Sequence, residues 1–160
     1  MIKILVVDDE KPICDLIDLN LSASGYQCRT VQDGLEALNI IESDPFDLIL
    51  LDIMLPGDDG YTILEQLKSM PSVKDVPVIM VTSRDSEADE VLSMSYGADD
   101  YITKPYNPTI LLLRINAVFK RLCAKSDNTT AYRGMEIFPH KGVIKYKDDE
   151  ITLTKNEMTI

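Results

Sequence analysis

Hydrophobic and polar positions follow two alternating patterns over residues 1 to about 122. Short apolar runs rich in β-branched residues, typical of buried parallel strands, predict strands at residues 2–7, 26–31, 46–51, 77–81 and 101–103. Between them, apolar residues recur at helical spacing, which predicts helices at residues 11–23, 34–41, 61–67, 88–96 and 108–122. Strands that alternate with helices predict an α/β fold, in which helices cover both faces of a five-stranded parallel sheet.

The pattern changes after residue 122. Residues 123–131 are mostly polar and predict a linker, and residues 132–160 predict short strands at 135–138 and 143–146, with turns at 139–142 and 147–150. Thr154 and Glu157 have the spacing of a capping box, which would begin a helix. About 38 residues are too few for an independent core. We therefore expect one domain at 1–122, the linker at 123–131 and a short β-rich C-terminal fragment at 132–160.

Composition and charge narrow the class of protein. The chain is 45% apolar and 27% charged, as in ordinary soluble domains. It has no apolar run of about 18 residues and no signal-peptide pattern, so we expect a cytoplasmic protein with no membrane partner. The net charge of −11 arises within residues 1–122, which hold 10 basic and 21 acidic residues and would repel nucleic acid. The three scattered cysteines predict buried free thiols.

Polar residues follow four of the five predicted strands. Asp8 and Asp9 follow the first strand, Asp52 the third, Thr82 the fourth and Lys104 the fifth. Each residue alone has an ordinary structural explanation, such as a helix cap or a surface charge. Because ligands bind at the carboxyl ends of strands in open parallel sheets, we expect all five side chains to meet in one pocket.

The chemistry of such a pocket points to a phosphoryl group. Three neighbouring carboxylates repel one another, and a hard divalent cation with oxygen ligands, Mg²⁺ above all, relieves that repulsion. A carboxylate beside Mg²⁺ and an ammonium group can act as a nucleophile towards phosphorus, because both cations offset the charge of the incoming phosphate. Lys104 and the hydroxyl of Thr82 are suited to bind phosphoryl oxygens.

Four stretches fit a known family in order and spacing. They are residues 5–10 (LVVDDE), 47–57 (DLILLDIMLPG), 77–83 (PVIMVTS) and 97–106 (GADDYITKPY). Together they resemble the receiver domains of bacterial two-component response regulators, over residues 1 to about 122. The resemblance implies a flavodoxin-like (βα)5 receiver fold and a phosphoacceptor domain that is not an enzyme beyond its own phosphorylation and dephosphorylation. It also implies that a sensor histidine kinase is the partner that donates the phosphoryl group.

The resemblance also implies a role for each site residue. Asp52 would be the phosphoacceptor, while Asp8, Asp9, Asp52 and the backbone carbonyl of Met54 would hold Mg²⁺. Thr82 and Lys104 would contact the phosphoryl oxygens, and the Lys104–Pro105 bond would be cis. Tyr101 would be the switch residue that changes rotamer as Thr82 moves. Spacing alone would instead make Tyr101 a half-buried strand aromatic.

Residues 132–160 resemble the opening of the winged-helix effector domain of OmpR/PhoB-type regulators, which would make this protein a transcription regulator. The helix that would enter the major groove is not in this sequence, so we expect DNA binding only through a complete effector domain. Such receivers pair through charges on their fourth helix, fifth strand and fifth helix. That pattern is present at Asp99, Asp100 and Arg114. It is absent at four other positions where such receivers tend to have salt-bridging charges, namely Glu90, Ser95, Ile110 and Asn116. A homodimer through this face is therefore in doubt.

Two other functions stay open. A stand-alone receiver would pass phosphate along a relay or act as a phosphate sink, and it differs from a transcription regulator only in lacking a longer natural chain with a complete effector domain. An acid-nucleophile phosphatase of another α/β family would require Asp-x-Asp at the nucleophile, whereas Asp52 is followed by Ile53 and Met54. The sequence therefore favours the receiver over the phosphatase.

Overall fold

The computed structural model describes residues 1–57, 59–83 and 87–125, together with four short strands between residues 131 and 152. Side chains are described as far as Cys123, except at Glu87. Within these residues, no helix is both long enough and apolar enough to cross a membrane.

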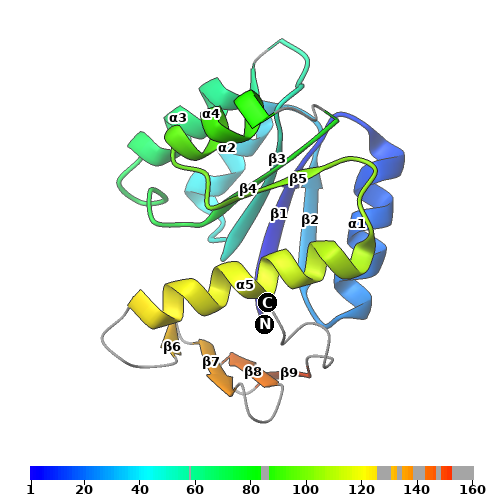
Figure 1. Ribbon diagram of the computed structural model, residues 1–160, viewed down its shortest axis with the longest axis vertical. Coiled ribbons are helices and arrows are strands. Elements are labelled where there is room, and N and C mark those ends of the chain that lie inside the picture. The colour runs from blue at the N-terminus through cyan, green and yellow to red at the C-terminus, as the bar shows by residue number, and fades with distance from the viewer. Residues whose placement is uncertain are drawn as a thin grey trace.

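A five-stranded parallel sheet forms the centre of the molecule (Figure 1). Its strands are β1 (Lys3–Val7), β2 (Gln27–Val31), β3 (Leu48–Asp52), β4 (Val78–Thr82) and β5 (Asp100–Thr103). They lie in the order β2-β1-β3-β4-β5. The register aligns Val7 with Leu51 and Asp52 with Val81, so the ends of β1, β3 and β4 lie level with one another.

Among the described residues, a helix follows each strand of this sheet, and the five helices cover both of its faces. They are α1 (Lys11–Ala23), α2 (Gly34–Ser43), α3 (Gly60–Ser69), α4 (Glu87–Ser95) and α5 (Pro108–Lys125). Figure 1 shows α1 and α5 on one face, and α2, α3 and α4 on the other. The predicted α/β fold is confirmed, and the predicted and observed ends of the elements differ by at most three residues.

Alternating side chains of the strands build a separate core on each face. Ile4 and Val6 of β1 face α1 and α5, whereas Leu5 and Val7 face α2 and α3. Because both faces are buried, β3 and β4 are buried along their whole length. This explains why their sequences are continuous apolar runs without a polar face.

The helices begin and end at recognisable signals. The carboxylate of Asp33 accepts from the backbone N–H of Glu36 at 2.7 Å and caps α2. The carboxylate of Asp59 accepts from the N–H of Tyr61 at 3.0 Å and caps α3. After α1, Gly25 has a φ of 90°, the left-handed conformation in which glycine commonly ends a helix.

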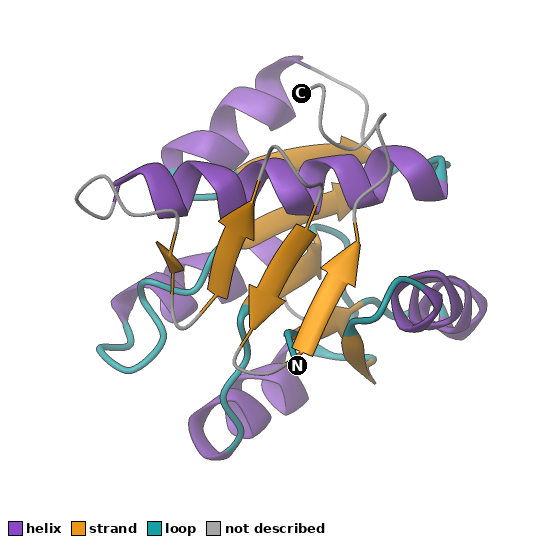
Figure 2. Cartoon of the chain, turned by 90° about the horizontal axis from the view of Figure 1, so that it is seen from below, coloured by secondary structure: helices purple, strands orange, loops and turns teal. Residues whose placement is uncertain are grey.

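A second, antiparallel sheet follows α5 in the chain and lies beside that helix (Figure 2). It consists of β6 (Ala131–Tyr132), β7 (Met135–Phe138), β8 (Val143–Tyr146) and β9 (Asp149–Thr152), in sequence order. The strands predicted at 135–138 and 143–146 are confirmed. The turn predicted at 147–150 is wrong in its second half, because β9 starts at Asp149 and pairs with β8. The predicted capping box at Thr154 and Glu157 lies outside the described residues.

All three cysteines are free thiols, as predicted. Cys14 and Cys123 are buried, but Cys28 is only half-buried, which differs from the expectation of burial for all three. Burial raises the pKa of the Cys14 and Cys123 thiols to about 11 and that of Cys28 to about 12. Since the thiolate is the reactive form, these cysteines are structural side chains at neutral pH.

Candidate functional site

The ends of β1, β3 and β5 bring an acidic cluster and one lysine together. Ligand atoms of four carboxylates, those of Asp8, Asp9, Glu10 and Asp52, all lie within 4.8 Å of one another. Asp8 and Asp52 are buried, whereas Asp9 and Glu10 are exposed. The cluster therefore has a buried floor and an open rim, so a small ion could enter from solvent.

Lys104 extends over this cluster from the end of β5. Its Nζ lies 2.6 Å from Oδ2 of Asp8, 3.1 Å from Oδ2 of Asp52 and 3.4 Å from Oε1 of Glu10. The Lys104–Pro105 peptide bond is cis, as predicted. The backbone N–H of Lys104 also donates to the carbonyl of Thr82 at 2.6 Å, which fixes the end of β5 against the end of β4.

Backbone amides orient the two buried carboxylates. The N–H of Met54 donates to Oδ1 of Asp52 at 3.0 Å, and the N–H of Glu10 donates to Oδ1 of Asp8 at 2.9 Å. The second oxygen of each carboxylate is the one in contact with Lys104. Both side chains are thus held in one orientation by neighbours in sequence, which is what a site that presents a nucleophile needs.

Burial and charge shift the pKa values of the site in definite directions. Burial raises the pKa of the Asp52 carboxyl, against the lowering effects of the Met54 amide and of Lys104. Burial would lower the pKa of Lys104, but its contacts with Asp8 and Asp52 outweigh that effect and raise it. At neutral pH the ammonium group of Lys104 is therefore charged. One ammonium group faces several carboxylates, and the site as a whole carries excess negative charge.

The loop after Asp52 approaches the strand end closely. Met54 and Asp59 form an isolated antiparallel bridge, and the N–H of Gly60 donates to the carbonyl of Ile53 at 2.8 Å. A Cβ atom at Gly60 would lie 2.3 Å from the carbonyl oxygen of Asp52, far inside any real contact. Only glycine fits there, so the start of α3 rests directly on the backbone of Asp52.

Thr82 and Tyr101 lie further inside the fold. Thr82 is fully buried at the end of β4, one residue past Val81, the partner of Asp52 in the sheet. Tyr101 is 8% exposed and belongs to the core on the face of the sheet that α2, α3 and α4 cover. It is thus more deeply buried than the half-buried strand aromatic that spacing alone predicts.

Two residues near the site were not among the predicted site residues. Glu10 joins the carboxylate cluster, and its position directly after Asp8 and Asp9 was the signal that could have revealed it. Cys14 of α1 donates its thiol to the carbonyl of Asp8, with a distance of 3.2 Å between sulfur and oxygen. This contact ties the first turn of α1 to the floor of the site.

The donor set fits a hard divalent cation. Carboxylate oxygens are the ligands that Mg²⁺ and Ca²⁺ prefer, and the cluster offers them within the span of a single ion. Burial is the main cause of the raised pKa of Asp52, and the negative charge of Asp8 adds to it, so a cation bound among these carboxylates would relieve their repulsion. No cysteine or histidine takes part in the cluster, so its chemistry does not favour zinc.

Known proteins share the sequence pattern and the fold. The sequence profile of the response regulator receiver domain matches residues 4–116, more than half of the chain. The receiver domain of the Francisella response regulator 1452 is 34% identical, with a TM-score of 0.70 over 76% of this chain and 98% of that one. A CheY-like receiver domain protein from Methanospirillum hungatei is 37% identical, with a TM-score of 0.68 over 73% and 92%.

A third similar structure is the BeF3-activated N-terminal receiver domain of RstA from Klebsiella pneumoniae. It is 36% identical to this chain, with a TM-score of 0.67 over 72% of this chain and 96% of that one. All three structures cover about three quarters of this chain and nearly the whole of their own. They are similar to the part that contains the parallel sheet and the acidic cluster.

Proposed function

The chain belongs to the response regulator receiver family and contains the receiver domain of a two-component response regulator, and we propose that Asp52 is its phosphoacceptor. The observation that supports this choice is the position of Asp52 among the carboxylates. It is buried, one oxygen is held by the Met54 amide, and the other contacts Lys104. Asp8 is also buried and contacts Lys104, but it follows β1, whereas Asp52 ends β3, the central strand of the sheet.

The transfer itself needs little from the protein beyond position and charge. An oxygen of the Asp52 carboxylate attacks phosphorus of a phosphohistidine, the N–P bond breaks, and the departing imidazole takes up a proton. Lys104 offsets the charge of the phosphoryl oxygens, and the Thr82 hydroxyl donates to one of them. Because only the protein itself is modified, we propose a signalling domain rather than an enzyme, with self-phosphorylation and self-dephosphorylation as its only reactions.

Asp8, Asp9, Asp52 and the backbone carbonyl of Met54 are proposed to hold Mg²⁺. When bound, this ion neutralises charge on the phosphoryl group and on the carboxylates. The residues prepare the site in two ways: the amides of Glu10 and Met54 fix the orientation of Asp8 and Asp52, and the exposed Asp9 completes the rim. Glu10 lies close enough to bind a water of the ion or Lys104 itself.

Tyr101 is proposed to be the aromatic switch that follows the movement of Thr82. In the sheet, Thr82 aligns with Thr103, two residues beyond Tyr101 on the same strand. Tyr101 is buried here, so a change of rotamer towards solvent would uncover a large aromatic surface. The phosphodonor that fits a receiver domain is a sensor histidine kinase.

We propose further that the receiver controls transcription as part of an OmpR/PhoB-type regulator. The antiparallel sheet of β6 to β9 supports this, because it matches the small sheet expected at the start of such an effector domain. The similar receiver of RstA is likewise described as N-terminal. The alternative is a relay intermediate or phosphate sink. The two functions differ in the fate of the phosphoryl group on Asp52. A relay intermediate passes it to a histidine of a phosphotransfer domain, whereas a transcriptional switch keeps it until hydrolysis releases phosphate.

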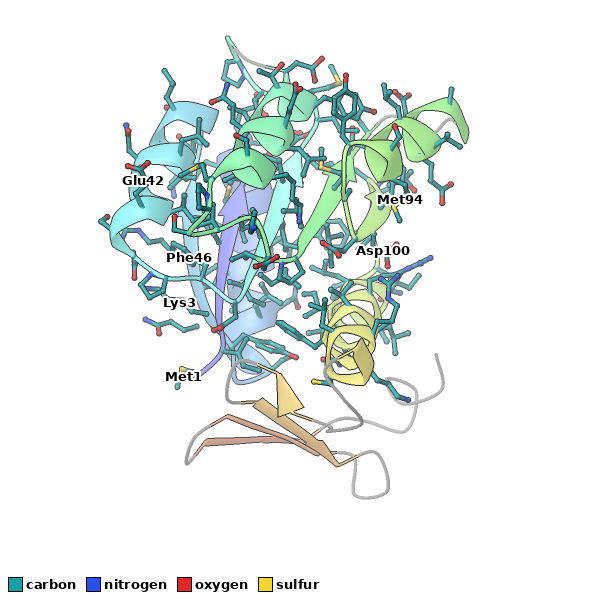
Figure 3. All side chains as sticks on the ribbon, turned by 90° about the vertical axis from the view of Figure 1, so that its left-hand side faces the viewer. Met1, Lys3, Glu42, Phe46, Met94 and Asp100 are labelled. Carbon is teal, nitrogen blue, oxygen red and sulfur yellow. The ribbon has the colours of Figure 1, made fainter. Side chains whose placement is uncertain are left out.

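A homodimer through α4, β5 and α5 has mixed support. Asp100 forms an ion pair with Arg114 at 3.3 Å, and Arg121 donates to the carbonyl of Asp99 at 2.8 Å, so these charges are engaged within the chain. Asn116 faces inward, where its Oδ1 accepts from the Tyr26 hydroxyl at 2.7 Å. Figure 3 shows Met94 of α4 and Asp100 of β5 on the side of the molecule nearest α5. A dimer here would rest on apolar contacts more than on salt bridges.

Labelling with a small acyl phosphate tests the proposal. In the presence of Mg²⁺, intact mass should rise by one phosphoryl group in the wild type and not in Asp52→Asn. Asp47→Asn is the matched control, because Asp47 is also a buried aspartate beside β3 but at the opposite end of the strand. Equal labelling of wild type and Asp52→Asn, or labelling that a chelator leaves unchanged, would contradict the assignment.

A further inference from the structure

Helix α4 is short and buries few of its own side chains. It has nine residues, and isolated helices shorter than about 12–15 residues are marginal in water. Among its described side chains, residues 88–95, only Ser93 is buried. Its apolar residues Val91, Leu92 and Met94 are instead exposed, at 68%, 41% and 45%. The position of α4 must therefore depend on contacts supplied by neighbouring elements.

Tyr61 of α3 supplies contacts at both ends of α4. Its hydroxyl lies 3.2 Å from the backbone carbonyl of Asp89 and 3.2 Å from Oδ1 of the same residue, in the first turn of α4. Its ring stacks on that of Tyr96, which directly follows α4, with centroids 5.5 Å apart and an interplanar angle of 29°. We call these contacts, of Tyr61 with Asp89 and Tyr96, the Tyr61 clamp.

The same residue is joined to the phosphoacceptor loop. Tyr61 directly follows Gly60, where a Cβ would lie 2.3 Å from the carbonyl oxygen of Asp52. The N–H of Tyr61 donates to the carboxylate of Asp59 at 3.0 Å. Tyr61 is itself only 6% exposed and is fixed in the core of that face. A shift of the backbone at Ile53, Met54 or Asp59 would therefore move the Tyr61 ring and its hydroxyl relative to α4.

We propose that the Tyr61 clamp holds α4 in its present position and links that position to the state of the Asp52 loop. When the loop moves, the hydroxyl of Tyr61 leaves Asp89, and α4 loses the contacts that compensate for its missing apolar anchors. Tyr61 is thus a positioning residue, not a catalytic one. The first half of this inference concerns the free protein only, and the link to Asp52 rests on the function proposed above.

Hydrogen exchange measured by mass spectrometry tests the clamp in the free protein. Tyr61→Phe removes the hydroxyl and keeps the ring, and Tyr96→Ala removes the stacking partner while Tyr61 stays in place. Each should speed exchange of the α4 amides by roughly 2- to 10-fold, as expected for the loss of one hydrogen bond or one aromatic pair. Exchange in β1 and β3 should not change beyond the effect of global stability.

Tyr26→Phe is the matched control, because it removes a comparable buried tyrosine hydrogen bond, to Asn116, on the opposite face. It should lower global stability in urea without an effect confined to α4. If Tyr61→Phe and Tyr96→Ala leave α4 exchange at the wild-type rate, or change it no more than Tyr26→Phe does, the clamp is refuted.

A second measurement tests the link to Asp52. Beryllofluoride mimics a phosphoryl group on aspartate, and fluorine NMR reports whether Asp52 is occupied. In the wild type, occupation should speed α4 exchange, and in Tyr61→Phe the further increase should be smaller, since the hydroxyl contact is already lost. No occupation would contradict the proposed function. Occupation with unchanged α4 exchange, or an equal increase in both proteins, would overturn the link.

Discussion

Replacing Lys104 by methionine tests how far one ammonium group stabilises the acidic cluster. Methionine is similar in length but carries no charge, so the change removes the counter-charge with little loss of volume. The side chain of Lys104 is 9% exposed, and those of Asp8 and Asp52 are 3% and 4% exposed. Solvent therefore screens these interactions much less than it would screen a surface ion pair.

The magnitude follows from the two short contacts. At an effective dielectric constant of 20, charges 2.6 Å and 3.1 Å apart attract by about 6 and 5 kcal/mol. Most of this is offset by the cost of removing the three groups from water. Breaking a buried pair by removing one partner typically costs about 3–5 kcal/mol. Because Asp8 and Asp52 keep their hydrogen bonds from the Glu10 and Met54 amides, we expect the lower end, about 3 kcal/mol.

Urea unfolding at pH 7 measures this cost, in chelator and in about 10 mM Mg²⁺. A bound divalent cation can replace the lost charge, so the penalty of Lys104→Met should fall by about half or more in Mg²⁺. The pKa of Lys104 is raised on folding, so its stabilising effect is fully present below the unfolded value of about 10.4 and is lost only as the pH rises through the folded one. The penalty should therefore be constant between about pH 6 and 9.

Lys68→Met is the control, because Lys68 pairs with Asp99 at 3.6 Å, far from the cluster. It should cost less, and Mg²⁺ should not change its cost. The reasoning is refuted if Lys104→Met is as stable as the wild type in chelator. It is also refuted if Mg²⁺ leaves the loss of unfolding free energy in Lys104→Met unaltered. Either result would mean that the carboxylates relieve their repulsion without a cation.

Three further predictions concern the same pocket. In chelator at pH 7, Asp52→Asn should be more stable to urea than the wild type. The folded protein raises the pKa of Asp52, so the ionised carboxyl destabilises the wild type at pH 7 and the protonated one does not in acid. The stability advantage of Asp52→Asn should therefore vanish as the pH falls from the raised pKa of the folded protein to the ordinary pKa near 3.8, and an advantage that grows in acid would contradict this prediction. Mg²⁺ should raise the thermal midpoint of the wild type, and Asp9→Asn should show a smaller rise; equal rises would exclude Asp9 as a ligand. Gly60→Ala should lower unfolding free energy by about 1–3 kcal/mol and slow acyl phosphate labelling, because its Cβ would meet the Asp52 carbonyl at 2.3 Å; wild-type stability would show that the loop yields freely.

Much of the fold was predictable because the parallel sheet is buried on both faces. Such strands are continuous apolar runs, and the helices between them have one apolar face, so the two patterns separate cleanly along the chain. The helix predicted at residues 11–23 has the same bounds as the observed α1. The β6 strand was missed because its two residues, Ala131 and Tyr132, are too few to give a pattern.

The meeting of Asp8, Asp52 and Lys104 was predictable because they share one position relative to their strands. A residue that directly follows a strand lies at the same edge of the sheet whatever its number in the chain. Contacts between helices have no such rule. Tyr61 is on α3 and Tyr96 directly follows α4, and their stacking depends on the angle at which α3 and α4 pack. Nor could spacing show that Asn116 faces Tyr26 rather than solvent.

The order of the strands has a consequence for when the site comes into being. Asp8 and Asp52 lie at the ends of β1 and β3, which are neighbours in the sheet, but Lys104 comes from β5, beyond β4. During synthesis, both aspartates leave the ribosome long before the lysine does. A nascent chain that stops short of β5 can hold the acidic pair but not its counter-charge. Reaction of Asp52 with a phosphodonor would thus indicate that β5, the last strand of this sheet to be synthesised, has joined the other four.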